Sequence, residues 1–344
     1  MRIAVDAMGG DHAPVEVIKG CIDALKLIPH EICLVGDEAR IRGELAKYEY
    51  NKEQITIKHA PDIITFDEAP VRAIRTKKES SMVVGINMVK DGEAAIFISA
   101  GSSGALMAGG LFILGRIPGI DRPAIAATIP MLKTGGVALI VDAGANPECK
   151  PENLMQFAVM GDLYCKSVFD MESPRIGLAN MGTEPGKGSG TLKTTYEMLE
   201  ASSMEFVGNV EARDLQESVC DVIVCDGMVG NVLLKSLEGT AKTIMSIIQD
   251  KFTESVRSKM GAALLLPQIR QLKKMFDYSE YGGAPILGVK GSLIKMHGSY
   301  KANGVKNTIL KAIPYAENNV IECIEQSVAT LKEEESKEES SEQE

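Results

Sequence analysis

Short runs of β-branched and apolar residues recur along the chain, and each run ends in a polar or glycine-rich break. Stretches with helical apolar spacing lie between the runs, for example Val15, Ile18, Ile22 and Leu25. This alternation predicts an α/β fold with a mostly parallel sheet and helices on both faces, a three-layer α/β/α arrangement. The predicted strands are 2–5, 31–35, 54–58, 94–98, 137–141, 175–178, 205–207 and 221–224.

The breaks after these strands share a composition of Asp, Asn, Gly and Ser. Turn formation and helix capping explain one such loop, but six of them predict a shared site, because parallel strands place their carboxyl ends at one edge of a sheet. The candidate residues in these loops are Asp6, Gly9, Gly10, Asp11, His12, Ser99, Gly101, Ser102, Ser103, Gly104, Asp142, Asn146, Asn180, Glu184, Asn209, Asp226, Gly227 and Asn231. Two later glycine-rich breaks contain Gly282, Gly283 and His297.

The chemistry that these loops favour is the binding of a small anion. Backbone N–H groups and hydroxyls of a Gly-Ser loop that enters a helix suit an anion, although a tight turn with serine caps is the alternative. The three aspartates at strand ends are bases, orienting groups or loop anchors, and the sequence does not rank these roles. His12 and His297 have either a structural or a catalytic role. The sequence lacks G-x-G-x-x-G after a strand, G-x-S-x-G and H-E-x-x-H, which disfavours the usual dinucleotide-binding, α/β-hydrolase and zinc-hydrolase sites.

The segment 232–276 has a different character from the rest of the chain. Helical apolar spacing continues over four turns, and the range 251–274 then carries six basic residues and one Glu. Pro267 interrupts this basic stretch, which predicts two amphipathic helices joined at an apolar tip. A last helix is predicted at about 302–331. We expect one domain over 1–331 and a disordered acidic tail over 332–344.

Composition narrows the class of protein further. The net charge of −10 gives no basic footprint for nucleic acid. Seven cysteines without C-x-x-C spacing indicate reduced thiols in a cytosolic protein. Asp6 interrupts the apolar start, so no signal peptide is predicted. The uncharged window 94–115 is rich in Gly and Ser, which favours a buried strand, a loop and a helix over a membrane span.

The opening segment 1–14, with Asp6-Ala-Met-Gly-Gly-Asp-His12, resembles that of the bacterial phosphate acyltransferases of phospholipid synthesis, the acyl-carrier-protein:phosphate transacylases. The loops at 99–105, 142–146, 180–184, 208–213, 226–231, 281–284 and 297–299 agree in order, and only the acidic tail lies outside the resemblance. The family usually has Asn-Thr where this chain has Ser102-Ser103, and Ser at the position of Tyr300. Both changes retain small polar groups or a hydroxyl.

The resemblance implies that fatty acyl-ACP and inorganic phosphate become acyl phosphate and free carrier protein. It also implies a homodimer and a fold similar to phosphotransacetylases and to isocitrate and isopropylmalate dehydrogenases. Because phosphate is itself nucleophilic and a thiolate is a good leaving group, we expect direct attack in a ternary complex, without metal, cofactor or acyl-enzyme. The implied roles are phosphate or substrate binding for the glycine-rich loops and Gly282-Gly283, and hydrogen bonding or charge stabilisation for Asn180, Asn209, Asn231, His12 and His297.

The apolar tip predicts contact with an anionic membrane surface, and the alternatives are contact with acyl carrier protein or with a second subunit. Its residues are Arg257, Lys259, Leu264, Leu265, Leu266, Arg270, Lys273 and Lys274. A cytoplasmic enzyme held peripherally at the inner face of the cell membrane could pass acyl phosphate to a downstream glycerol-3-phosphate acyltransferase. The competing functions are a short-chain phosphotransacylase that uses coenzyme A, a dehydrogenase of similar fold, and a membrane scaffold without activity.

Overall fold

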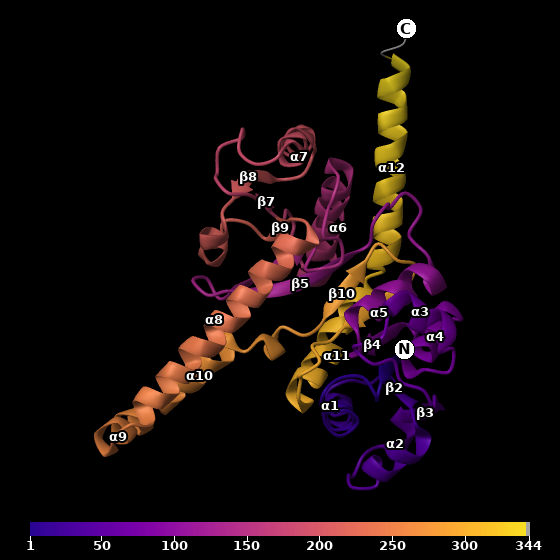
Figure 1. Ribbon diagram of the computed structural model, residues 1–344, viewed down its shortest axis with the longest axis vertical. Coiled ribbons are helices and arrows are strands. Elements are labelled where there is room, and N and C mark those ends of the chain that lie inside the picture. Colours follow the sequence, from indigo (N-terminus) through magenta and orange to yellow (C-terminus); the bar gives the residue numbers. More distant parts are fainter. Residues whose placement is uncertain (342–344) are drawn as a thin grey trace.

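The computed structural model describes the backbone of residues 1–341 and the side chains of residues 1–330, and across them the strands form one 11-stranded sheet (Figure 1). The strand order is β3-β2-β1-β4-β11-β10-β5-β6-β9-β7-β8. The strands are β1 (Arg2–Asp6), β2 (Glu31–Gly36), β3 (Ile55–His59), β4 (Ile96–Ser99), β5 (Ala124–Met131), β6 (Gly136–Val141), β7 (Ile176–Ala179), β8 (Phe206–Val210), β9 (Val222–Val224), β10 (Ala284–Leu287) and β11 (Ser292–Lys295). All eight strands predicted from the sequence are present, and the mostly parallel sheet is confirmed.

The sheet consists of two parallel groups that run in opposite directions. Strands β3, β2, β1, β4 and β11 are mutually parallel, and so are β6, β9, β7 and β8. The pairings β11–β10, β10–β5 and β5–β6 between the two groups are antiparallel, and three reversals leave the second group opposed to the first. Our expectation that all the polar loops leave one edge of the sheet is therefore wrong.

Helices cover both faces of the sheet, which confirms the three-layer arrangement. α1, α6, α11 and α12 share one apolar core with β1, β2, β4, β6 and β9, whereas α3, α4 and α5 pack on the opposite face of the first parallel group. The helices are α1 (Val15–Leu25), α2 (Glu38–Leu45), α3 (Pro70–Thr76), α4 (Ser81–Lys90), α5 (Ser103–Gly109), α6 (Pro151–Phe169), α7 (Gly190–Ala201), α8 (Gly227–Thr253), α9 (Val256–Leu264), α10 (Leu266–Phe276), α11 (Ala302–Glu317) and α12 (Val320–Ser341). One π-helical stretch, Gly110–Leu114, continues α5.

Alternation along the strands divides the core between the two faces. In β1, Ile3 and Val5 belong to the core under α1 and α6, and Ala4 between them belongs to the core under α4. β4 repeats the pattern with Ile96 and Ile98 on one face and Phe97 on the other. Successive side chains of a strand point to opposite faces, so a sheet covered on both sides needs apolar residues at every position.

The three helices α8, α9 and α10 form an arm that projects from the body (Figure 1). α9 ends at Leu264 and α10 begins at Leu266 with Pro267 in its first turn, so the predicted helix pair is present and proline starts the second helix. None of the helices within residues 1–341 is long and apolar enough to cross a membrane, and the window 94–115 forms β4, a loop and α5 with its π-helical end.

The last predicted helix is in fact two helices. α11 ends at Glu317, and Asn319 adopts a left-handed conformation (φ 50°) before α12 begins. Asn tolerates this conformation better than other residues with a Cβ, and the helical spacing on both sides concealed the break. α12 runs on to Ser341, into the acidic segment that we predicted to be disordered, while residues 342–344 lie outside the described part of the chain.

Candidate functional site

A cavity of about 430 Å³ lies where the two parallel groups of strands meet. The first group supplies Lys295 at the end of β11 and the loop that follows it. The second supplies Asn231 and Lys235 near the start of α8, and β5 forms the wall between them. The other lining residues are Asp11, Phe66, Ser103, Ile125, Ala127, Thr128, Ala143, Leu234, Glu238, Tyr278, Gly282, Gly283, Ala284, His297, Gly298, Ser299 and Tyr300.

Asp6 anchors two of the glycine-rich loops beside this cavity. One carboxylate oxygen accepts hydrogen bonds from the backbone N–H groups of Met8 and Gly9, at 3.0 and 3.1 Å, and the other accepts the Ser99 hydroxyl at 2.7 Å. Ser99 Oγ in turn accepts the N–H of Gly101 at 3.0 Å. Burial raises the pKa of Asp6, and these hydrogen bonds act in the opposite direction. Asp6 is 2% exposed, so it positions the loops rather than facing the cavity.

The close approach of these two loops explains why glycine is required at positions within them. A Cβ on Gly9 would lie 2.7 Å from the backbone nitrogen of Gly101, and Gly10 has a φ of +96° that favours glycine. Ser102 caps α5 by accepting the N–H of Ala105. The N–H groups of Gly9 and Gly101 are thus held in internal hydrogen bonds, and Ser103 is the residue of the Gly-Ser loop that lines the cavity.

Asp142 repeats the arrangement of Asp6 in the second group of strands. Its Oδ1 accepts the N–H groups of Ile125, Gly144 and Ala145, and its Oδ2 accepts the N–H and the side-chain amide of Asn146, at 2.7 and 2.9 Å. Asp142 is fully buried, and burial raises its pKa against these hydrogen bonds. Asn146 also donates to the carbonyl of Pro123. These polar groups fix the loop between β6 and α6.

The start of α8 packs directly on this loop. Asp226 caps the helix by accepting the N–H of Val229 at 2.8 Å, and the N–H of Gly227 donates to the carbonyl of Asn146 at 2.7 Å. A Cβ on Gly227 would lie 2.8 Å from the backbone nitrogen of Asn146, so only glycine fits. This contact directs the next turn of α8, with Asn231, to the cavity.

Lys295 is the half-buried cation of the site. It ends β11, and its Nζ donates to the carbonyl of Met296. Burial lowers the pKa of its ammonium group to about 8, while the carboxylates of Asp6 and Asp11 act to raise it. Lys235, on α8, lowers it further, which places the two lysines within each other's electrostatic reach.

The loop after β11 carries the histidine of the site. His297 Nδ1 interacts with the N–H of Ser299 at 3.2 Å and with its hydroxyl at 2.8 Å. Tyr300 lies beside the imidazole and donates its hydroxyl to the carbonyls of Tyr278 and Gly282, both at 3.1 Å. Gly282 has a φ of +87°. Tyr300 therefore joins the loop of Gly282 and Gly283 to that of His297.

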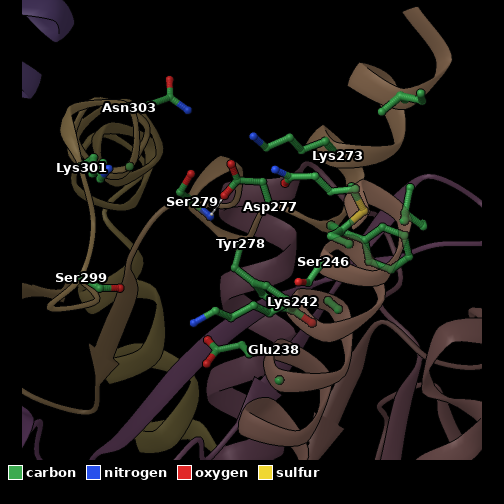
Figure 2. Close-up of a pocket in the computed structure, with 18 of the residues that line it drawn as sticks. Glu238, Lys242, Ser246, Lys273, Asp277, Tyr278, Ser279, Ser299, Lys301 and Asn303 are labelled. Atoms are coloured by element: carbon green, nitrogen blue, oxygen red, sulfur yellow. Dashed lines mark hydrogen bonds between the residues drawn. The ribbon is translucent and has the colours of Figure 1, made fainter. Parts of the chain in front are cut away.

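A larger cavity of about 1330 Å³ continues from the first along the arm. The two share Lys235, Glu238, Tyr278, His297, Ser299 and Tyr300. Apolar side chains of α8, α9 and α10 line the outer part, namely Ala241, Met245, Ile248, Phe252, Ala262, Ala263, Leu266, Ile269 and Phe276. Figure 2 shows Glu238 and Lys242 projecting from α8 toward the same side of this cavity, with Asp277 and Tyr278 on a neighbouring wall.

Three predicted site residues form a separate network on β7 and β8. The Asn180 side-chain amide donates to Asn209 Oδ1 at 3.0 Å, and that of Asn209 donates to the carbonyl of Glu184 at 2.9 Å. None of the three lines either cavity. They brace the loop that joins β7 to α7. His12 is exposed and also lies outside both linings, whereas Asp11, Ser103, Asn231, Gly282, Gly283 and His297 line the smaller cavity.

The sequence analysis missed Lys295 and Lys235. Lys295 ends a four-residue strand, Ser-Leu-Ile-Lys, directly before Met296 and His297, and its nearness to His297 was the available signal. Lys235 lies four residues after Asn231, one helical turn away. No three His, Cys, Asp or Glu side chains in the described part of the chain gather as a set that could hold a metal ion.

The sequence is similar to that of known proteins over nearly its whole length. A family model described as "Fatty acid synthesis protein" matches residues 1–323. A phosphate acyltransferase from Clostridioides difficile is 46% identical over 97% of this chain and 98% of its own length, and one from Brevibacillus brevis is 49% identical over 95% and 97%. The chain belongs to the phosphate acyltransferase family. This confirms the family resemblance inferred from the ordered loops.

Solved structures show the same fold at low sequence identity. A phosphotransacetylase from Streptococcus pyogenes matches with a TM-score of 0.61 at 16% identity, over 93% of this chain and 94% of its own. A branched-chain phosphotransacylase from Enterococcus faecalis gives 0.58 at 15%, over 92% and 99%. A 4-hydroxythreonine-4-phosphate dehydrogenase from Klebsiella pneumoniae gives 0.51 at 13%, over 92% and 99%. The chain therefore shares its fold with phosphotransacylases, as predicted. It also shares its fold with a dehydrogenase, here a 4-hydroxythreonine-4-phosphate dehydrogenase, whereas the prediction named the isocitrate and isopropylmalate enzymes.

Proposed function

We propose that this member of the family converts fatty acyl-ACP and inorganic phosphate to acyl phosphate and free carrier protein, in the first step of phosphatidic acid synthesis. The main support is the match to phosphate acyltransferases over nearly the whole chain. The cavities agree with it, because a smaller cavity that contains two lysines joins a larger one whose outer part is lined by apolar side chains. A compact anion and a long acyl chain require these two environments.

The proposed chemistry is direct attack in a ternary complex. A phosphate oxygen forms a bond to the thioester carbonyl carbon, and the carbonyl electron pair moves onto its oxygen. When the carbonyl re-forms, the C–S bond breaks, and the carrier thiolate leaves and takes a proton from water. Positioning of the two reactants and donors for the oxyanion supply the catalysis. This route needs neither an acyl-enzyme nor a cofactor, because phosphate is a nucleophile and a thiolate leaves readily.

The larger cavity suits the acyl chain of the donor. Its outer wall is formed by apolar side chains of α8, α9 and α10, and burial of each methylene group contributes about 0.8 kcal/mol. Lys259 and Lys273 also line it, and with Arg257, Arg270 and Lys274 they give the arm a positive surface. We include the acidic carrier protein as the partner of this surface.

The arm also supports a peripheral position at an anionic membrane. Leu264 at the tip is 83% exposed, and Leu265 and Leu266 beside it are partly exposed. Apolar side chains at a basic tip insert into the interface of an anionic bilayer. Acyl phosphate formed there would pass to a membrane acyltransferase that uses glycerol 3-phosphate. We place the enzyme in the cytoplasm, at the inner face of the cell membrane.

The test is the release of free carrier protein from palmitoyl-ACP with and without inorganic phosphate, in the presence of EDTA. We expect phosphate-dependent release and an acyl phosphate that hydroxylamine traps as the hydroxamate. Release without phosphate would indicate a thioesterase instead. If acyl-ACP gives no product but acyl-CoA does in the same assay, the donor is coenzyme A, and an acyl group trapped on a Ser or Cys would rule out direct attack.

A further inference from the structure

The two lysines of the smaller cavity come from opposite parts of the fold. Lys295 ends β11, in the parallel group that contains β1 and β4, whereas Lys235 lies on α8, directly after β9 of the other group. Both line the same space of about 430 Å³. They are 60 residues apart in the sequence, and the antiparallel strands β10 and β5 join their two groups of strands in the sheet.

The half-buried ammonium group of Lys295 calls for an anionic partner. An ammonium group has three donors, and among the contacts of the described residues Nζ donates to one acceptor, the carbonyl of Met296. Removing such a charge from water is costly unless it is paired and hydrogen-bonded. Asp6 is held by the loops and Ser99, so its carboxylate balances Lys295 from a distance without accepting its protons.

Neutral donors surround the two lysines. Asn231 lies one turn before Lys235 on the same face of α8, and both line the cavity. Ser103 and Thr128 bring hydroxyls from α5 and β5. Two cations with hydroxyl and amide donors in a small space match the several oxygens of a compact anion.

Two carboxylates also face this cavity. Asp11 is exposed, and Glu238 lies where the smaller cavity joins the larger one. Figure 2 shows Glu238 projecting into the larger cavity on the same side as Lys242. Lys235, like Glu238, lies where the two cavities join, whereas Lys295 and Asn231 line the smaller cavity alone. The part of the smaller cavity beside these two lysines and Asn231 is the part that best accommodates negative charge.

We propose that Lys295 and Lys235 together bind the phosphate nucleophile and hold it between the two groups of strands. This assignment rests on the proposed acyl transfer to phosphate. It places the phosphate on two side chains rather than on the N–H groups of Gly9 and Gly101, which already have acceptors. Phosphate then lies in the smaller cavity, which joins the acyl cavity at Lys235, and its oxygen can reach a thioester carbonyl that enters from the arm.

The experiment measures phosphate binding without any acyl donor. Isothermal titration and thermal unfolding with inorganic phosphate are carried out in a phosphate-free buffer on the wild-type chain, Lys295→Met, Lys235→Met and Lys290→Met. Lys290 is the matched control, because it is exposed and lies before the other end of β11, outside the smaller cavity. Steady-state kinetics then give KM for phosphate and kcat for each variant.

We expect phosphate affinity to fall about ten-fold or more in each cavity variant, as for the loss of a charge-assisted hydrogen bond. KM for phosphate should rise in parallel, and Lys290→Met should match the wild type. Lys235 is exposed, so its variant decides the matter even if Lys295→Met does not fold. If Lys235→Met binds phosphate with the affinity of the wild type, or if the wild type does not bind phosphate, the proposal that the two lysines bind phosphate is wrong.

Failure of this inference is distinct from failure of the proposed function. If the wild type makes acyl phosphate and both cavity variants keep its KM for phosphate, the lysine assignment alone is wrong. If phosphate binding depends on both lysines and no acyl donor gives acyl phosphate, the anion site is supported and the reaction is wrong.

Discussion

Lys295 gives the site a titration near neutral pH. Burial lowers its pKa to about 8, Lys235 adds to the shift, and Asp6 and Asp11 oppose it. Glu238, His297, Tyr278 and Tyr300 are the other charged and titratable groups that line the same cavity. Because the lysine binds phosphate only in its protonated form, KM for phosphate should rise above pH 8.

Ionisation of phosphate affects KM in the opposite direction from deprotonation of Lys295, which makes the prediction specific. A higher pH favours the more highly charged phosphate and would by itself improve binding, so a rise in KM must come from the protein. Lys295→Arg is the control, because a guanidinium group stays protonated throughout this range. Its KM should show no such rise. An identical rise in the arginine variant would assign the titration to another group.

The roles of Asp6 and Asp142 became clear only in the structure. Both follow a strand and precede glycines, and the sequence left them as bases, orienting groups or anchors. The structure surrounds each carboxylate with backbone N–H groups, so the geometry favours the anchor. Such a role depends on which N–H groups converge on the carboxylate, and spacing along the chain does not give that information.

At the scale of elements, the sequence predicted eight strands and missed β5, β10 and β11, the three that connect the two groups. β5 reads Ala-Ile-Ala-Ala-Thr-Ile-Pro-Met, with alanines and a proline that are poor strand signals, and β10 (Ala-Pro-Ile-Leu) and β11 (Ser-Leu-Ile-Lys) each contain one β-branched residue. The antiparallel pairings of these three strands reverse the direction of the second parallel group, and Lys295 is the last residue of β11. Missing these strands therefore caused both the wrong expectation that all polar loops leave one edge of the sheet and the failure to find Lys295.

In the arm, the helix pair and apolar tip predicted from the sequence are both present in the structure. The pair Leu264→Glu and Leu265→Glu places two negative charges on the exposed tip between α9 and α10. We expect the double variant to lose binding to vesicles of anionic phospholipid in a flotation assay, because it loses apolar insertion and adds repulsion. Activity with a soluble acyl donor should remain within about two-fold.

The control for the tip is Leu27→Glu, since Leu27 is an exposed leucine just after α1, far along the chain from the arm. This variant should float with the vesicles as the wild type does. Unchanged vesicle binding of the tip variant would exclude the tip as the membrane contact and leave the carrier protein or a second subunit as its partner.

At the scale of the whole molecule, the order of the loops identified the family, while their positions required the fold. The loops of Asp6, Ser99, Asp142 and Asp226 occur in a fixed sequence order that spans both halves, and this order was enough for recognition. Their placement around a cavity depends on β10 and β5, which join the halves. Asn180 and Asn209 follow the same loop chemistry and yet pair with each other on β7 and β8.

The outer side of α8 predicts a second copy of the chain as a partner. Met228, Val232 and Ile247 on α8 are 62%, 58% and 55% exposed, and Val229 and Ile244 on the same helix are also exposed. Apolar surface of this kind indicates an interface. Sedimentation velocity should show a dimer for the wild type and a monomer for the pair Val232→Glu and Ile247→Glu, because each unpaired charge buried at the interface costs about 2 kcal/mol or more. Met181→Glu, at an exposed apolar position outside the arm, should remain dimeric. A wild type that sediments as a monomer, or a double variant that stays dimeric, would remove this side of α8 as the subunit interface.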